Sequence, residues 1–164
     1  MDIRRRLSGA HYRLGVATFL RSDRSGILGL VENAIASRTH FETCLADRDK
    51  VAAIDRRDVF TAAEALLVRA RLGQIPEVEK GASELLKTPS LDLAARYQVA
   101  CVYAVASSSA RDPDTAKRLK TWCFDLLNDL AEAGWRGVGD LLTEPDLASI
   151  RDDVEFEALL KRMK

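Results

Sequence analysis

The stretch LDLAARYQVACVYAVA, residues 91–106, decides the fold class because its apolar residues cover nearly every face of a helix. A helix that is apolar on all sides is enclosed by other elements. On both sides of this stretch apolar residues recur at helical spacing, and nowhere do β-branched residues alternate over the length of a strand between turn signals. The sequence therefore predicts an all-α protein in which residues 91–106 form the central helix.

Capping and turn residues divide the flanking sequence into further helices. Asp112 and Pro113 have the pattern of an N-cap followed by a proline in the first helical turn. Asp58 predicts the start of an earlier helix, Gly73 its end, and Pro76 the first turn of the next one. The final helix should carry the apolar face formed by Phe156, Leu159, Leu160 and Met163.

The N-terminal third of the chain predicts two helices in contact. The first has two apolar stripes, one including Leu14 and the other including Tyr12, and is expected to be covered on two sides. Gly15 occupies the small-residue position where the two helices touch. The second helix begins at Ile27 and is long, with an apolar set formed by Ile27, Val31, Ala34, Ile35, Phe41 and Leu45.

The helices repeat along the sequence. A shift of about 34 residues, the period of tetratricopeptide repeats, places Leu66 on Ala100 and Val59 on Leu93. This period predicts one domain, a short α-solenoid of about three tetratricopeptide-like hairpins with a C-terminal capping helix. Its parts are a loose first hairpin, a second hairpin, a third hairpin and the cap, at residues 1–57, 58–92, 93–136 and 137–164.

The composition excludes several classes of partner. Lys+Arg and Asp+Glu number 25 each, so no net positive field attracts nucleic acid or an anionic membrane. No apolar run approaches the ~18 residues of a membrane-spanning helix. Cys44, Cys101 and Cys123 lack a C-x-x-C spacing and lie among apolar residues. We expect buried free thiols and a cytoplasmic location.

The glycines at 134, 137 and 139 do not form a phosphate-binding loop. Such a loop needs a preceding strand and a following Lys and Ser or Thr, whereas here a helix precedes and no lysine follows. Gly134 is better explained as the left-handed residue that ends a helix. Thr143, Pro145 and Asp146 then resemble a capping box that opens a short helix.

Metal and catalytic sites have little support in the sequence. His40 and Cys44 lie one helical turn apart and would supply half of a zinc site, but His11 is the only other histidine. No convergent cluster of His, Glu, Asp and Cys identifies a catalytic centre. We therefore expect no metal, no cofactor and no catalytic residue. A small helical metal-dependent enzyme remains the alternative function.

The sequences YQVACVYAVA (residues 97–106), Gly134-Trp135 and LLTEPDLASIRDDVEFEALL (residues 141–160) resemble the closing segment of tetratricopeptide arrays. Such segments follow the catalytic domains of large bacterial multidomain serine/threonine kinases and occur in related signalling proteins. The resemblance implies that the tail docks over the open end of the array through Pro145, Asp146, Leu147, Ile150, Arg151, Phe156, Leu159 and Leu160.

The chain also departs from that family. The proline common before the tail phenylalanine is missing, and DDVEF stands in its place. The kinase signatures are absent from the sequence, so only the interaction module is implied and not the kinase activity. The expected function is non-catalytic protein–protein interaction, as an adaptor or a detached regulatory module.

In tetratricopeptide arrays the first helix of each hairpin lines a concave groove. The register set by Gly15, Leu66 and Ala100 assigns eight residues to this inner strip: Tyr12, Val16, Phe19, Phe60, Leu67, Arg71, Tyr97 and Cys101. The inner strip is mostly apolar, and only Arg71 could bind a peptide carboxylate. An apolar helix, a second copy of the chain or the chain's own terminal segments would cover it. Alternatively, the array is too short to curve and these residues are core.

Overall fold

The protein is built from helices. The computed structural model describes residues 10–18, 27–54, 58–89 and 91–163, and within these ranges it contains no strand. The prediction of an all-α fold is confirmed. Residues 10–18 are helical. The other elements are α2 (Ile27–Ile54), α3 (Val59–Arg71), α4 (Ile75–Leu86), α5 (Leu93–Ser109), α6 (Pro113–Glu132), α7 (Val138–Thr143), the 3₁₀ helix η1 (Pro145–Ile150) and α8 (Val154–Arg162).

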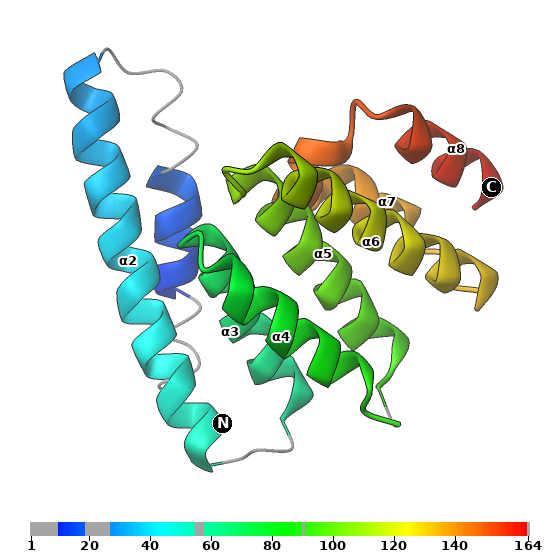
Figure 1. Cartoon of the computed structure of the whole chain (residues 1–164), viewed down its shortest axis with the longest axis horizontal. Coiled ribbons are helices and arrows are strands. Elements are labelled where there is room, and N and C mark those ends of the chain that lie inside the picture. The colour runs from blue at the N-terminus through cyan, green and yellow to red at the C-terminus, as the bar shows by residue number, and fades with distance from the viewer. Residues whose placement is uncertain (1–9, 19–26, 55–57, 90, 164) are drawn as a thin grey trace.

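The helices follow one another across the molecule, with α2 at one end and α8 at the other (Figure 1). α5 packs against α3, α4, α6 and η1. Every residue from Val99 to Ser107 is buried, as the apolar pattern of this helix predicted. α3 begins at Val59 and α5 begins 34 residues later at Leu93. No helix in the described ranges has the length and apolar content needed to cross a bilayer.

Side-chain caps and glycines set the helix ends. Asp58 accepts a hydrogen bond from the backbone of Thr61 at 3.1 Å, and Asp112 accepts one from that of Thr115 at 2.9 Å. These bonds satisfy backbone donors that a helix leaves unpaired in its first turn. Gly73 and Gly134 follow α3 and α6 with φ of 73° and 87°, a conformation that favours glycine. Both predicted caps and the predicted role of Gly134 are confirmed.

The segment 10–18 packs along α2. The Ser37 hydroxyl donates to the Gly15 carbonyl at 3.0 Å, and a Cβ on Gly15 would lie 2.7 Å from the Phe41 ring. Gly15 is therefore the small contact residue that the sequence predicted. The prediction of two covered faces is wrong, because Leu14 is 50% exposed. Ile35, in the apolar set of α2, is 63% exposed.

α2 is joined to α3 by charged side chains as well as by apolar packing. Arg48 pairs with Glu64, and Arg69 Nη2 lies 3.0 Å from Asp49 Oδ1. Phe41 and Cys44 of α2 pack with Val68 of α3 in a separate small cluster of buried residues. These contacts attach the N-terminal part of the chain to the helices that follow.

The C-terminal segment docks on two helices. η1 packs on α5 and α8 on α6. Ile150, Phe156 and Leu159 are at most 2% exposed, while Leu160 is half-buried. Lys120 of α6 approaches Asp153 Oδ2 to 2.9 Å. The tail is therefore part of the core, as the resemblance implied.

The start of η1 differs from the predicted capping box. Glu144, and not Thr143, caps this helix, since its side chain accepts a hydrogen bond from the Asp146 backbone at 3.3 Å. The Thr143 hydroxyl instead donates to the Gly139 carbonyl at 2.9 Å. Asp153 stands at the N-cap of α8 but makes no side-chain cap bond there. Its carboxylate is held by Lys120 instead.

We predict that Phe156→Ala lowers the free energy of unfolding by about 3–5 kcal/mol, because it removes a fully buried aromatic side chain. Urea unfolding followed by circular dichroism measures the loss. The matched control is Val154→Ala on the same helix, whose side chain is 79% exposed. Equal effects of the two substitutions would show that α8 is not docked on α6.

Candidate functional site

Most residues of the predicted inner strip are buried or half-buried, and the C-terminal segment contacts Tyr12, Arg71 and Tyr97 among them. Leu67, Tyr97 and Cys101 are 5%, 7% and 1% exposed. Phe60, at the start of α3, is 42% exposed. Phe19 lies outside the described residues. Leu67, Tyr97 and Cys101 belong to the main hydrophobic core, so this part of the inner strip is core and not an open groove.

Trp135 and Asp146 are the residues of the C-terminal segment that contact the inner strip. The Trp135 ring centroid lies 4.8 Å from that of Tyr97. Gly137 leaves room for the Trp135 indole, because a Cβ at position 137 would collide with this ring. Two of the three glycines in this region thus have structural roles, with Gly134 ending α6 and Gly137 accommodating the aromatic contact.

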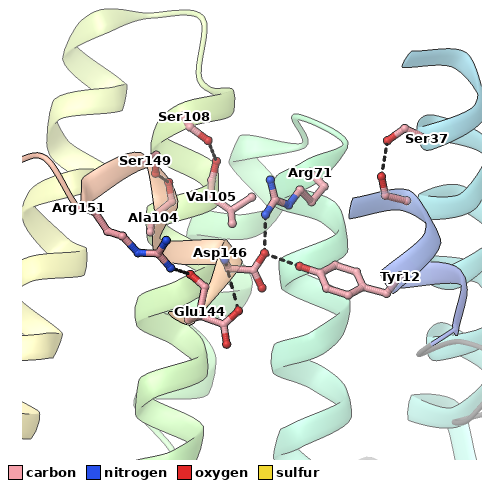
Figure 2. A network of polar contacts seen from close by, with 11 residues as sticks. Tyr12, Ser37, Arg71, Ala104, Val105, Ser108, Glu144, Asp146, Ser149 and Arg151 are labelled. Atoms are coloured by element: carbon pink, nitrogen blue, oxygen red, sulfur yellow. Dashed lines mark hydrogen bonds and ion pairs between the residues drawn. The ribbon is translucent and has the colours of Figure 1, made fainter. Parts of the chain in front are cut away.

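A buried carboxylate joins three separate parts of the chain. The side chain of Asp146 is 7% exposed. Its Oδ1 accepts hydrogen bonds from Tyr12 Oη at 2.7 Å and from Arg71 Nη2 at 2.5 Å (Figure 2). Burial, followed by the charge of Asp146, raises the pKa of Tyr12 well above its ordinary value, so this hydroxyl remains a donor. The segment 10–18, α3 and η1 meet at this atom.

Further polar contacts lie within the η1 segment and between η1 and α5. Arg151 donates to the Glu144 carbonyl, and the Ser149 hydroxyl donates to the Ala104 carbonyl at 3.2 Å (Figure 2). Burial, followed by the charge of Asp146, raises the pKa of Glu144. Val16, which the sequence assigned to the inner strip, lines a cavity of about 470 Å³ beside Arg71 and Asp146. The predicted residues Tyr12, Val16 and Arg71 therefore do come together.

A second concavity lies between α4 and α6. It measures about 430 Å³ and is lined by Glu79, Ser83, Leu86, Lys87, Tyr103, Trp122, Asp125 and Leu126. The Tyr103 and Trp122 ring centroids are 5.5 Å apart. We call this concavity the aromatic groove. Sequence reasoning missed it, because Trp122 recurs with Leu119 and Leu126 at helical spacing, which predicts an inward position, whereas in the structure it is half-buried.

Arg118 lies at the edge of the aromatic groove and contacts two of its lining residues, Trp122 and Glu79. Its guanidinium carbon lies 5.5 Å from the Trp122 ring centroid, and its Nη2 lies 2.5 Å from Glu79 Oε1. Burial, followed by the charge of Glu79, raises the pKa of Tyr103, which keeps its phenol neutral. The aromatic groove therefore combines the accessible part of Trp122 with the Asp125 carboxylate and the Arg118–Glu79 ion pair, and Lys87 also lines it. The spacing of Arg118 and Trp122, one helical turn apart, is the signal that would have found it.

All three cysteines are buried and none of them forms a disulfide, as predicted. Burial raises the pKa of the Cys123 thiol to about 12 and that of Cys101 well above its ordinary value. Both thiols are protonated at neutral pH and are poor nucleophiles and metal ligands. Among the residues described, no group of three or more His, Cys, Asp or Glu side chains could hold a metal ion.

Comparisons with known proteins gave no match. No protein-family model matches the chain, and neither does any curated protein or solved structure. The geometry of the described residues is therefore the basis for assigning a function.

We predict that Asp146→Ala lowers the free energy of unfolding by about 3–5 kcal/mol, because it leaves the buried guanidinium of Arg71 without its carboxylate. The double variant Asp146→Leu, Arg71→Met should recover much of this loss, since it removes both buried charges. A double-mutant cycle from urea unfolding measures the coupling. Additive effects of the two single changes would show that the pair is not formed.

A second prediction concerns pH. The raised pKa of Glu144 means that the folded state binds its proton more tightly than the unfolded state. Deprotonation therefore destabilises the fold as the pH rises through this pKa. Glu144→Gln can still accept the Asp146 backbone bond, so its stability relative to the wild type should increase from pH 4 to pH 7. Urea unfolding at both pH values tests this, with Glu155→Gln as the exposed control. A constant difference would contradict it.

Proposed function

We propose that this protein is a non-catalytic protein–protein interaction module with a tetratricopeptide-like array of helical hairpins. The short connections within the pairs α3/α4 and α5/α6 make the paired helices antiparallel neighbours. The 34-residue distance between the starts of α3 and α5 equals the tetratricopeptide period. The docked tail supports the role of a terminal cap. This architecture suits an adaptor or a regulatory module of a signalling system.

The observation that carries the proposal is the half-buried Trp122 beside Tyr103 in the aromatic groove. Tryptophan and tyrosine contribute large contact areas and are enriched among the residues that dominate binding energy at interfaces. The half-buried Trp122 leaves part of such a ring accessible in the groove between α4 and α6. This position outside the inner strip keeps the groove accessible while the tail remains docked.

The charges of the aromatic groove define the partner. Asp125 places a carboxylate at its edge, whereas Glu79 is paired with Arg118, whose guanidinium lies over the Trp122 ring; Lys87 also lines the groove. The partner that fits is a protein segment that presents an apolar side chain next to a lysine or arginine. The apolar group would contact Leu86 and Leu126, and its basic neighbour would meet Asp125. Nucleic acid and membrane surfaces are not proposed as partners.

The inner strip is not the proposed binding surface. Arg71, the residue that could have bound a peptide carboxylate, is already engaged with Asp146. Tyr97 is covered by Trp135. A ligand at this strip would have to displace the tail and expose the core beneath it. The three buried free thiols support the proposal of a reducing, cytoplasmic location.

We predict that Trp122→Ala removes binding to peptides that contain an apolar residue beside a basic one. Peptide display against the purified full chain identifies such sequences, and calorimetry with a synthetic peptide measures the affinity. A central aromatic contact contributes about 2 kcal/mol or more, so the affinity should fall by at least about 30-fold. Circular dichroism verifies that the fold is retained.

Phe60→Ala is the matched control, because it removes a partly exposed aromatic side chain at the opposite pair of helices. Binding should be unchanged in this variant. If Phe60→Ala abolishes binding while Trp122→Ala does not, the interaction site lies on the inner strip. If display yields no peptides with the apolar–basic pattern, the aromatic groove is not a recognition site.

A further inference from the structure

The fold brings together the two histidines of the sequence. His11 lies on the helical segment 10–18 and His40 on α2, 29 residues apart in the chain. Their Nδ1 atoms lie 3.4 Å apart, within hydrogen-bond reach, and their ring centroids are separated by 5.7 Å. Both side chains are half-buried, so protons from solvent can reach the rings. The pair is a direct polar contact between the segment and α2.

The charge state of the two rings decides whether this hydrogen bond can form. With both rings neutral, one Nδ1–H donates and the other Nδ1 accepts. With one ring protonated the bond persists, because the charged ring donates to its neutral neighbour. With both rings protonated each Nδ1 carries a hydrogen, so no acceptor remains and two positive charges face each other across 3.4 Å. Histidine changes charge between about pH 5 and pH 8, so acidification passes through these states in turn.

The other contacts of the segment 10–18 lack this sensitivity. Tyr12 donates to Asp146 Oδ1 at 2.7 Å, and the raised pKa of Tyr12 keeps its hydroxyl protonated over this range. Ser37 donates to the Gly15 carbonyl at 3.0 Å, and neither group titrates. The rings of Tyr12 and Phe41, with centroids 5.8 Å apart, form an apolar contact. Among the contacts described for this segment, the histidine pair is the one that acid converts from attraction to repulsion.

The surrounding charges do not neutralise a doubly protonated pair. The titratable groups on the segment and on the elements packed around it are Tyr12 and Arg13 on the segment, Arg38, Glu42, Cys44, Asp47, Arg48, Asp49 and Lys50 on α2, Glu64, Arg69 and Arg71 on α3, and Asp146 on η1. Every carboxylate in this set is already paired with an arginine or a lysine. In the described part of the chain neither histidine forms an ion pair with a carboxylate.

We propose that His11 and His40 form a pH-sensitive latch, which holds the segment 10–18 on α2 at neutral pH and releases it below about pH 6. Gaining the second proton removes the hydrogen bond and adds a repulsion at the same place. The binding of this proton is therefore coupled to undocking, because the undocked segment separates the two charges. The latch acts away from the aromatic groove and does not depend on the function proposed for it.

Release of the segment would uncover one side of the buried network. Tyr12 would leave Asp146, which would keep Arg71 as its partner. Phe41, at present 3% exposed, would lose its contact with the segment. The cavity of about 470 Å³ that Val16 lines together with Phe41, Arg71 and Asp146 would lose the wall that the segment provides. Acid would thus open this cavity while the helices from α3 onward remain packed.

The experiment follows the full chain by NMR between about pH 7 and pH 5, where histidine changes charge. At pH 7 we expect cross-relaxation between the rings of Tyr12 and Phe41 and protected amides in the segment 10–18. At pH 5 the ring contact should disappear, and the protection factors of these amides, corrected for intrinsic exchange, should fall at least about tenfold while those of α5 are retained. A segment that stays protected at pH 5, or a parallel loss of protection in α5, would contradict the proposal.

The variant His40→Gln separates repulsion within the pair from other effects of acid. The glutamine amide can accept a hydrogen bond from His11 whether that ring is neutral or charged, and it adds no charge of its own. This variant should keep the segment docked at pH 5. Arg13→Gln, an exposed change on the same segment, is the matched control and should release the segment as the wild type does.

The wild-type pH dependence in His40→Gln, or its loss in Arg13→Gln, would show that another group controls docking and would overturn the latch. The reciprocal variant His11→Gln makes the same comparison from the other side. If a histidine variant does not fold, the wild-type titration decides.

Discussion

One carboxylate determines how the ends of this chain come together. Asp146 accepts hydrogen bonds from Arg71 and from Tyr12, a residue 134 positions earlier in the sequence. Apolar packing alone would allow η1 to shift along α5, because hydrophobic contacts are non-directional. A buried charge opposes such a shift, because moving the Asp146 carboxylate away from Arg71 and Tyr12 would leave it without these two donors in a medium of low polarity. The ion pair therefore defines the position of the tail, and with it the closure of the inner strip.

The surrounding contacts depend on that position. Trp135 reaches Tyr97 only if the chain leaves α6 through the left-handed Gly134 and passes Gly137 without a Cβ. Beyond η1, Lys120 of α6 forms an ion pair with Asp153 at the start of α8, which aligns α8 with α6. The polar contacts thus specify one arrangement of helices, while the buried apolar residues supply most of the stabilisation. The tail thus packs on α5 through η1 and on α6 through α8.

The sequence predicted local features well and distant ones poorly. The caps at Asp58 and Asp112, the left-handed Gly134 and the enclosed α5 all follow from rules that act over a few residues. Asp146 was assigned to a capping box because its partners are 75 and 134 residues away. The contact between His11 and His40, which are 29 residues apart, was missed for the same reason. Periodicity shows which face of a helix is apolar, but not which segment will cover it.

Closure of the inner strip changes where a partner can bind. A ligand at the inner strip would first have to displace the tail, and the free energy of this displacement would be subtracted from its binding free energy. The displacement would also expose the charge of Arg71 and the buried ring of Tyr97. The aromatic groove requires no such rearrangement, because Trp122 is already partly accessible between α4 and α6. Under the proposed function, recognition therefore falls to a surface that the tail leaves accessible, and the aromatic groove offers the partly accessible Trp122 there.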